Sequence, residues 1–418
     1  MYVIHGGNII EGKVRVQGSK NTVLPILAAA LLLSEPVTLK GCPKIADVFT
    51  MLSLIERLGG TWSWNGDLLT VDGTKIENWE VDGLLAQECR ASILFMGALL
   101  GKEKRVRIHK PGGCAIGKRP INIHVEGLKK LGAEVREELD FVQVSAKHMH
   151  SGSFKMEFPS VGATQNLILC CVKLPGVTRI YNAAREPEIV YLCDFLRKCG
   201  AKIQGERTGS IIIEGVKRLK GISYEIVGDR IVGGTYLTVA AAAGGSVEIE
   251  HVQPWEMESF LFLLERMGCH VYRAKESIRI CRDPKVRLKA VEQLFTQPFP
   301  GFPTDMQSQW MVAAAMADGK SKVTEKIFEN RFQIVEPLKQ MGADIQVEKD
   351  TACIQGVENL TGCEVWGKDL RGACALMVAG AAAQGTTFVH GQKYIDRGHE
   401  DIVRDFRQLG VKCERDEV

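Results

Sequence analysis

A repeated pattern constrains the fold of this chain more than any other feature of its sequence. Six helix-like segments each end in a glycine, and successive glycines are 68 to 74 residues apart. The segments are LIERLGG, LKKLGAE, FLRKCGAK, LLERMGCH, LKQMGAD and DFRQLGV, with Gly59, Gly132, Gly200, Gly268, Gly342 and Gly410 as the marker glycines. A fixed period of this length marks one supersecondary unit used several times, so we expect a fold built from six similar units.

Each unit is expected to contain a hairpin and an apolar helix. After each glycine the sequence alternates between apolar and polar residues, turns at a polar segment and alternates again, as in AKIQGERTGSIIIEGV. This alternation is typical of a β-hairpin. A further strand-like run leads into a helix, and segments such as VAAAAGG and ALMVAGAAA are apolar on nearly all sides. Such helices are buried, so we expect an α/β fold with helices inside and sheets outside.

The sixth unit is incomplete, and its missing half stands at the other end of the chain. Its last segment, VKCERDEV, supplies only one strand, whereas the N-terminal segment 2–32 matches the second half of a unit. We therefore expect three units in a first domain, residues 20–229, and three in a second domain, residues 1–19 and 230–418. Two domains also suit the length of 418 residues, because one core seldom grows beyond about 250–300 residues. The functional site is expected in the cleft between the domains.

Composition disfavours several classes of partner. The formal net charge is only +3 and no long block of like charges occurs, which argues against nucleic acid and membrane surfaces as partners. The sequence shows no signal-peptide pattern and no apolar run of about 18 residues, so we expect a cytoplasmic protein. The thirteen cysteines are scattered and form no Cys-x-x-Cys pair. We expect reduced thiols, with neither a metal nor a cofactor.

Charged and small polar residues open the apolar helix in all six units. They are Lys20 with Asn21, Arg90, Ser160 with Gly162, Arg230, Asp305, and Asp369 with Arg371. Helix N-termini carry unpaired N–H groups and a partial positive charge, so six of them together favour a phosphate or carboxylate ligand. Ser160, Asp229 and Asp305 are explained equally well as ordinary N-caps. The N-cap explanation does not account for the lysine and arginines, because positive charge is mildly unfavourable at a helix N-terminus.

A second set of residues opens the other helix of the units. It comprises Cys114, Arg119, Arg185, Arg331 and Arg397. Most arginines are solvated surface groups, but their aligned positions in the repeats favour a shared anion site.

Cys114 lies in the glycine-rich segment PGGCAIGKRP, close to Lys110, Lys118 and Arg119. Positive charge lowers the pKa of a thiol, and glycines allow a loop to move. We therefore expect a reactive cysteine on a closing lid, although an inert packed thiol is the commoner role of cysteine.

Eight motifs together resemble one enzyme family. They are GSKNTVLPILAA, PGGCAIGKRPINIH, SVGAT, NAAREPEIV, FPTDMQSQ, ENRF, DLRGA and IDRGHE. In this order, over essentially the whole chain, they resemble the UDP-N-acetylglucosamine 1-carboxyvinyltransferases, the enolpyruvyl transferases that begin bacterial peptidoglycan precursor synthesis. The resemblance implies two inside-out α/β barrel domains of three helix-hairpin-helix units each. It also implies transfer of the enolpyruvyl group of phosphoenolpyruvate to the 3-hydroxyl of UDP-N-acetylglucosamine, through a tetrahedral ketal.

The resemblance further implies roles for individual residues. Phosphoenolpyruvate would be bound by Lys20, Asn21, Arg90, Arg119, Arg331, Arg371 and Arg397. UDP-N-acetylglucosamine would be bound by Asn21, Arg90, Arg119, Pro120, Ile121, Asn122, Ile123, His124, Ser160, Val161, Gly162, Asp305 and Ile327. The implied catalytic residues are Cys114, Asp305, Lys20 and Arg397. Cys114 would donate a proton to C3 and react with fosfomycin, while Asp305 would either deprotonate the 3-hydroxyl or only orient it.

Two other functions remain open from the sequence. The sister transferase 5-enolpyruvylshikimate-3-phosphate synthase shares the fold and the phosphoenolpyruvate half of the site, but it does not use a loop cysteine. A catalytically silent paralogue would bind UDP-N-acetylglucosamine as a sensor or scaffold, which the presence of Lys20, Cys114, Asp305 and Arg397 disfavours. A nucleic-acid-binding module is a more distant alternative on grounds of charge.

Overall fold

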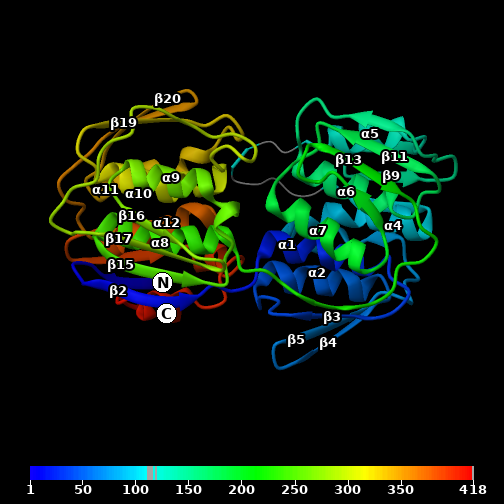
Figure 1. Ribbon diagram of the computed structural model, residues 1–418, viewed down its shortest axis with the longest axis horizontal. Helices are drawn as coiled ribbons and strands as arrows, with labels where there is room; N and C mark the ends of the chain where they lie inside the picture. Colours follow the sequence, from blue (N-terminus) through cyan, green and yellow to red (C-terminus); the bar gives the residue numbers. More distant parts are fainter. Residues whose placement is uncertain (111–115, 118–119, 417–418) are drawn as a thin grey trace. The chain divides into compact units, whose positions relative to one another are not determined.

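The computed structural model describes residues 1–110, 116–117 and 120–416, and within this part the chain forms two compact units (Figure 1). We call residues 18–227 the first unit, and residues 1–17 with 228–416 the second unit. Ile116 and Gly117 group with the second unit. Cys114, Lys118 and Arg119 lie outside the described residues.

One complete repeat shows how all six are built. It runs through β10 (Ser153–Lys155), α6 (Val161–Cys171), β11 (Val177–Tyr181), α7 (Pro187–Lys198), β12 (Lys202–Gln204) and β13 (Ser210–Glu214). Its sheet has the order β10-β11-β13-β12, in which β10 is parallel to β11 and the other pairs are antiparallel. Each helix thus follows a strand in the sequence, α6 contacts β13 and α7 contacts β12, and the hairpin closes the sheet.

The other two repeats of the first unit follow the same plan. One contains β6 (Glu80–Val81), α3 (Gly83–Glu88), η1 (Arg90–Leu94), α4 (Phe95–Glu103), β7 (Arg105–His109), α5 (Asn122–Lys130), β8 (Glu134–Glu137) and β9 (Phe141–Ser145). The other contains α1 (Lys20–Ala30), β3 (Val37–Lys40), α2 (Ala46–Arg57), β4 (Thr61–Asn65) and β5 (Leu68–Asp72), with β14 (Ser223–Glu225) as its first strand.

The second unit also has three repeats, each with one four-stranded sheet. One contains α8 (Arg230–Ala243), β15 (Gly245–Glu250), η2 (Pro254–Glu256), α9 (Glu258–Arg266), β16 (His270–Arg273) and β17 (Ser277–Arg282). The next contains β18 (Leu294–Phe295), η3 (Thr304–Met306), α10 (Gln307–Ala315), β19 (Lys320–Thr324), η4 (Arg331–Ile334), α11 (Val335–Gln340), β20 (Asp344–Glu348) and β21 (Thr351–Gln355). The last contains β22 (Glu364–Trp366), α12 (Leu370–Ala382), β23 (Thr386–His390), α13 (Gln392–Ile395), α14 (Ile402–Gln408) and β24 (Lys412–Arg415).

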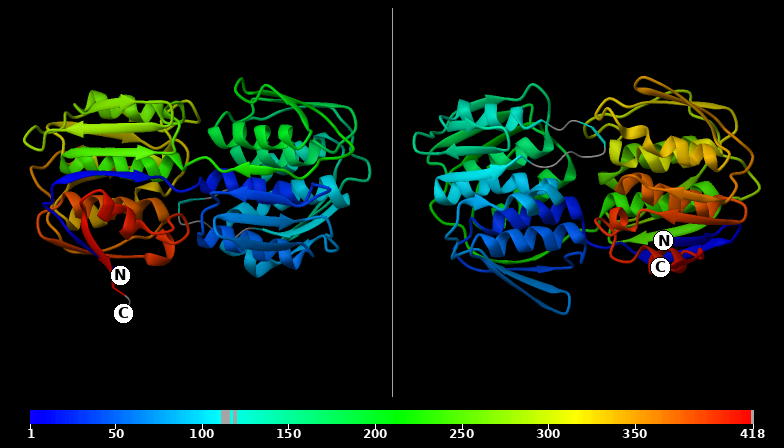
Figure 2. Two further views of the ribbon diagram at one scale, coloured as in Figure 1. Left: turned by 60° about the horizontal axis from the view of Figure 1, so that its bottom comes forward. Right: turned by 180° about the vertical axis from the view of Figure 1, so that it is seen from behind.

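The N-terminal strands complete two sheets of the second unit. β1 (Tyr2–His5) lies between β23 and β24 and is antiparallel to both. β2 (Ile10–Arg15) is parallel to β15. Figure 2 shows these blue strands beside the C-terminal part of the chain, as the truncated sixth repeat predicts.

The marker glycines have one structural role in common. Each lies two residues beyond the last residue of α2, α5, α7, α9, α11 or α14, and each has a positive φ, between 86° and 105°. Glycine adopts this conformation without the steric cost that a Cβ brings, which explains why each helix ends there. The six turns direct the chain from the helix into the hairpin.

Buried helices form the centre of each unit. In α8, every residue from Arg230 to Ala242 is buried, and this helix packs against α10 and α12. In the first unit, the buried helix α4 packs against α6, and α1 packs against α4, α7 and α2. The expected arrangement of inner helices and outer sheets is therefore confirmed for both units.

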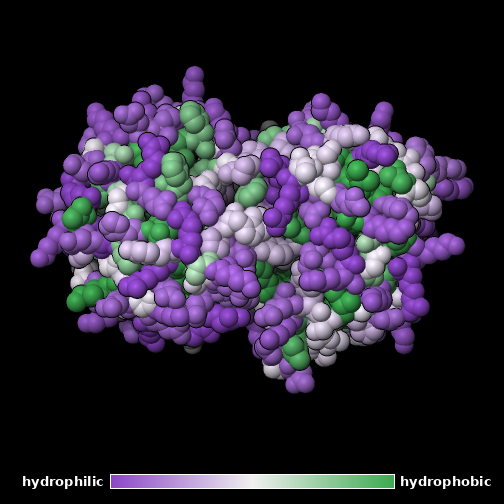
Figure 3. Space-filling view, viewed as in Figure 1, coloured by the Kyte–Doolittle hydropathy of each residue, from purple (hydrophilic) through white to green (hydrophobic). Residues whose placement is uncertain are grey.

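The surface differs from these cores in polarity. On the face drawn in Figure 3, both units present mainly hydrophilic residues with scattered hydrophobic ones. Within the described residues, no helix combines the length and apolar character needed to cross a lipid bilayer.

Candidate active site

Asp305 is the centre of a charged cluster in the second unit. Its carboxylate accepts hydrogen bonds from two guanidinium groups, with Arg371 Nη2 2.8 Å from Oδ2 and Arg331 Nη2 in contact with Oδ1. Arg331 begins η4 and Arg371 lies in the first turn of α12, so two repeats supply the arginines for a carboxylate from η3. Both arginines are buried, at 2% and 7% exposure. The cluster can therefore bind an anion in surroundings where charge interactions are strong.

The arginines determine the protonation state of Asp305. Burial by itself would raise the pKa of this carboxyl, but the positive charges of Arg371 and Arg331 outweigh it and hold the pKa far below its usual range. For Arg371, burial acts to lower the pKa, but Asp305 and Asp229 raise it above its usual range. Asp305 is therefore ionised at neutral pH, in the form that can accept a hydrogen bond.

Asp305 differs in its contacts from the residues that cap helix N-termini. Asp229 Oδ1 accepts hydrogen bonds from the N–H groups of Ile231 and Val232 at the start of α8. Asp369 caps α12 and Ser160 caps α6 in the same way. Asp305 has no such bond and instead pairs with arginines, so the N-cap interpretation holds for Ser160 and Asp229 but is wrong for Asp305.

Lys20 belongs to a second cluster, in the first unit. It is the first residue of α1, and its Nζ lies 2.6 Å from Oδ2 of Asp47 in the first turn of α2. Both side chains are largely buried. Asn21 follows in the same turn, and Arg90 begins η1 with its side chain partly buried. Asp47 was not among the expected site residues, although it stands in the aligned helix-opening segment PKIADV.

His124 and Gly162 meet in the first unit, although 38 residues separate them. A Cβ on Gly162 would lie 3.3 Å from His124 Nε2, so the imidazole faces the first turn of α6. The segment Pro120–Ile123 leads into α5 beside it, and Ser160 and Val161 begin α6. The two segments expected to bind the nucleotide are thus neighbours.

A buried amide determines which nitrogen of His124 carries hydrogen. Asn166 Oδ1 accepts the N–H of Gly97 at 2.7 Å, and Asn166 Nδ2 lies 2.7 Å from His124 Nδ1. Since the amide nitrogen donates, Nδ1 accepts and the ring hydrogen of the neutral imidazole is on Nε2. His124 therefore presents an N–H donor towards Gly162.

Arg397 lies in a turn between α13 and α14 that Gln17 holds. The Gln17 side chain donates to the carbonyl of Gly398 at 3.0 Å and accepts the N–H of Glu400 at 2.8 Å. Ile327 lies in the turn after β19, where its N–H donates to Glu325 Oε1 at 2.7 Å. Gln17 and Glu325 were not among the expected residues, because only folding brings these contacts together.

Arg185 differs from the other residues of its set. Its side chain is exposed, and Nε donates to the carbonyl of Arg207 at 3.0 Å. The surface interpretation therefore holds for Arg185.

Relatives of known name resemble the chain along its whole length. UDP-N-acetylglucosamine 1-carboxyvinyltransferase 2 from Caldanaerobacter subterraneus subsp. tengcongensis is 41% identical over 414 residues, which cover 99% of both chains. UDP-N-acetylglucosamine 1-carboxyvinyltransferase from Halothermothrix orenii is 42% identical over 410 residues, with 98% of both chains covered. The chain belongs to this family. The sequence pattern of the wider EPSP synthase (3-phosphoshikimate 1-carboxyvinyltransferase) family matches residues 4–406 of this carboxyvinyltransferase family member.

Solved structures show the same fold at lower sequence identity. The enolpyruvyl transferase NikO from Streptomyces tendae superimposes with a TM-score of 0.87 at 22% identity, covering 99% of this chain and 98% of NikO. EPSP synthase from Acinetobacter baumannii gives a TM-score of 0.76 at 18% identity and covers 99% of both chains. The expected fold class of this carboxyvinyltransferase family member is confirmed.

The cysteines of this carboxyvinyltransferase family member are free thiols throughout the described part of the chain. Most are buried, and burial raises the pKa of Cys170 and of Cys269 to about 12. These thiols are protonated and inert at neutral pH, as expected of packed cysteines. Cys114 and Arg119, which the family resemblance assigns to the site, lie outside the described residues.

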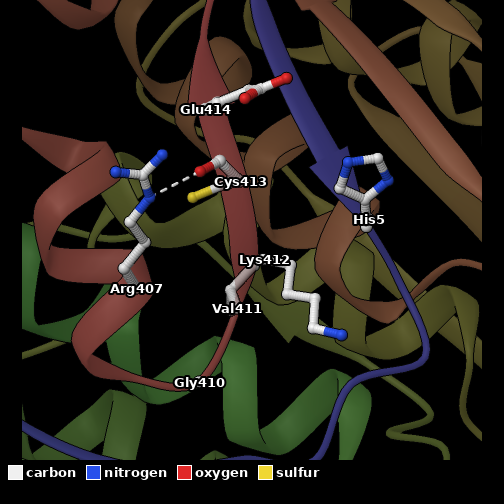
Figure 4. A pocket seen from close by; sticks show the side chains of 7 residues that line it. All are labelled: His5, Arg407, Gly410, Val411, Lys412, Cys413 and Glu414. Carbon is white, nitrogen blue, oxygen red and sulfur yellow. Dashed lines mark hydrogen bonds between the residues drawn. The ribbon is translucent and has the colours of Figure 1, made fainter.

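A surface pocket of about 390 Å³ lies apart from the charged cluster of the second unit. It is lined by His5, Arg407, Gly410, Val411, Lys412, Cys413 and Glu414 (Figure 4). Arg407 and Lys412 lie on opposite sides of β24, and Arg407 Nε donates to the Cys413 carbonyl at 2.8 Å. No described residue expected to bind substrate lines this pocket of the carboxyvinyltransferase family member. The candidate functional groups are therefore the Asp305 cluster of the second unit and the Lys20 cluster of the first unit, each considered by itself.

Proposed function

We propose that this protein transfers the enolpyruvyl group of phosphoenolpyruvate to the 3-hydroxyl of UDP-N-acetylglucosamine and releases phosphate. The observation that carries the proposal is the pair of buried guanidiniums, Arg331 and Arg371, on one carboxylate, Asp305. Phosphoenolpyruvate bears a phosphate and a carboxylate, which planar guanidiniums bind through two parallel hydrogen bonds. The family to which the chain belongs supports the same reaction.

The donor site is proposed to draw on cations from both units. Its residues are Lys20, Asn21, Arg90, Arg119, Arg331, Arg371 and Arg397. These groups offset the charge of phosphoenolpyruvate and of the phosphate that leaves. Burial of Lys20 and Arg331 strengthens this interaction, because little water competes with the ligand there.

The chemistry requires an acid at C3 and a base at the hydroxyl. The 3-hydroxyl oxygen bonds to C2 of the donor while Cys114 gives its proton to C3, which forms the tetrahedral ketal. Phosphate then leaves C2, and C3 loses a proton as the carbon–carbon double bond returns. Asp305, held as a carboxylate, accepts the hydroxyl proton or orients the hydroxyl for attack.

The acceptor nucleotide is proposed to bind where the segments 120–124 and 160–162 meet, with Arg119 assigned to the same ligand by the family resemblance. The Nε2–H of His124 is suited to a phosphate or carbonyl oxygen, and the N-terminus of α6 favours negative charge. Asn21, Arg90, Asp305 and Ile327 complete the proposed acceptor contacts. The product would be the first committed intermediate of peptidoglycan synthesis, made in the cytoplasm.

Phosphate release tests the proposal directly. The purified protein is incubated with phosphoenolpyruvate and either UDP-N-acetylglucosamine or shikimate 3-phosphate. We expect phosphate only with the UDP-sugar. Release with shikimate 3-phosphate would instead indicate the sister reaction, and binding of the UDP-sugar without turnover would indicate a silent paralogue.

A further inference from the structure

Glu325 is a buried carboxylate that joins two segments of the second unit. It follows the last residue of β19, is 4% exposed, and its backbone N–H donates to the Asp350 carbonyl at 2.8 Å. Its Oε2 accepts the hydroxyl of Thr304 at 2.8 Å. Its Oε1 accepts the N–H groups of Ile327 at 2.7 Å and Phe328 at 3.1 Å. One side chain therefore fixes both the 304 segment and the 325–328 turn.

The two segments carry the residues proposed to face the acceptor. Thr304 directly precedes Asp305, and its carbonyl accepts Arg331 Nε at 3.3 Å. The 325–328 turn contains Ile327 and leads to Arg331, which is bonded to Asp305. Glu325 is thus bonded to Thr304 on one side and to the turn that leads to Arg331 on the other, and Asp305 and Arg331 are bonded to each other. These contacts form a closed ring of interactions.

The chemistry of this position does not suit a purely structural role in a core. Burying a carboxylate costs free energy unless hydrogen bonds compensate it, and a leucine of similar size would avoid that cost. A leucine could not join the two segments, because neither the hydroxyl nor the two N–H groups would have a partner. The Glu325 carboxylate therefore fixes the position of the Thr304 segment relative to the 325–328 turn.

We propose that Glu325 is a positioning residue for the acceptor substrate. It sets the separation between the Asp305 carboxylate and the Ile327 turn, and so aligns the sugar hydroxyl while the nucleotide is held. This inference rests on the proposed function. Because Glu325 does not touch the reacting atoms, its loss acts through Asp305 and Ile327.

Three variants and one control separate positioning from stability. Glu325→Ala removes both links, and Thr304→Val removes only the link to the Asp305 segment while keeping the side-chain shape. Glu325→Gln keeps both links, because its carbonyl oxygen can accept the two N–H groups and its amide can donate to the Thr304 oxygen. The control is Ser321→Ala on the same strand, which loses a buried hydrogen bond from Val291 N–H at 3.0 Å without touching either segment.

The measurement is kcat and the KM of each substrate, with the unfolding temperature of every variant. In Glu325→Ala we expect kcat/KM for UDP-N-acetylglucosamine to fall by about 10- to 100-fold, since small misplacements cost that much. The KM of phosphoenolpyruvate should change much less. Thr304→Val should lower kcat, whereas Glu325→Gln and Ser321→Ala should stay near wild type in both parameters.

The outcomes distinguish this inference from the proposed function. Wild-type protein without turnover refutes the proposed function, and the inference is then judged by UDP-N-acetylglucosamine affinity measured by calorimetry. A folded Glu325→Ala with unchanged kinetics or affinity overturns the inference. So does an equal loss for both substrates, or an equal loss in Glu325→Gln. Should Glu325→Ala not fold, an unchanged kcat or affinity in Thr304→Val overturns it.

Discussion

Lys20 Nζ lies 2.6 Å from Asp47 Oδ2, and the two side chains are only 11% and 5% exposed. The pair joins the first turn of α1 to the first turn of α2. It also fixes an ammonium group that we propose to bind phosphoenolpyruvate. A long, flexible lysine loses much rotamer freedom on binding, and Asp47 supplies that ordering before the substrate arrives.

Asp47→Asn should therefore impair both stability and donor binding. Breaking a buried ion pair by removing one partner is strongly destabilising, so the free energy of unfolding should fall by about 3 kcal/mol. The KM of phosphoenolpyruvate should rise while that of UDP-N-acetylglucosamine changes little. Urea unfolding and steady-state kinetics measure the two effects. The control is Glu214→Gln, which breaks an exposed ion pair with Lys202 and should change neither the free energy of unfolding nor the KM of phosphoenolpyruvate. If Asp47→Asn also left both quantities unchanged, the proposed role of the Lys20–Asp47 pair would be contradicted.

The Asp305 cluster predicts a specific dependence of stability on pH. The folded-state pKa of Asp305 is depressed, whereas the unfolded value is about 3.9. Its contribution to stability is therefore complete well above pH 4 and is lost as the pH falls towards the folded-state pKa. The difference in unfolding free energy between wild type and Asp305→Asn should be constant from about pH 5 to 8 and should narrow below about pH 4. Urea titrations at each pH test this, and a gap that widens on acidification would contradict the assigned charge pairing.

Asn166 should control acceptor binding through His124. In Asn166→Leu the ring loses its partner at Nδ1, and the buried Gly97 N–H and Ile93 carbonyl lose theirs. The free energy of unfolding should fall by about 2 kcal/mol or more, because buried polar groups are left unsatisfied. The KM of UDP-N-acetylglucosamine should rise, with that of phosphoenolpyruvate little changed. Nitrogen NMR of the wild-type imidazole should show hydrogen on Nε2; hydrogen on Nδ1 would contradict the assigned tautomer.

Cys114 should be needed for turnover, although an aspartate at this position should replace it in part. Cys114→Ala removes the proposed acid, and general acids contribute about 100- to 10,000-fold to rates, so we expect a loss of that order. Cys114→Asp should keep part of the activity, because a carboxyl group can also deliver a proton to C3. Phosphate release compares the two variants with wild type. Unchanged turnover in Cys114→Ala would show that another group protonates C3.

Local signals made much of the architecture predictable. The six marker glycines indicated the helix ends, because a turn with positive φ selects glycine wherever the rest of the chain lies. The alternating runs after them indicated hairpins for the same local reason. Even the association of the N-terminal segment with the C-terminal part of the chain followed from counting half-repeats, although Tyr2 and its strand partner Arg415 are 413 positions apart in the sequence.

The hydrogen-bond and ion-pair partners of the site residues could not be predicted from the sequence. Arg331 and Arg371 were expected on aligned positions, but nothing in the sequence indicated that both would hold Asp305. Asn166 and Glu325 gave no signal in the sequence, and for Asp47 the only signal was its place in an aligned helix-opening segment, since each of these residues contacts a partner on another segment. Their importance became visible only as buried hydrogen-bond partners.

The amino-acid sequence by itself thus determined the repeat, the buried helices and the chemical types available for binding anions, because periodicity and turn chemistry act over a few residues. Tertiary structure decided which of those groups meet and in which protonation state. Burial and pairing depend on segments far apart in the chain, and they set the charge of Asp305, the tautomer of His124 and the fixed position of Lys20.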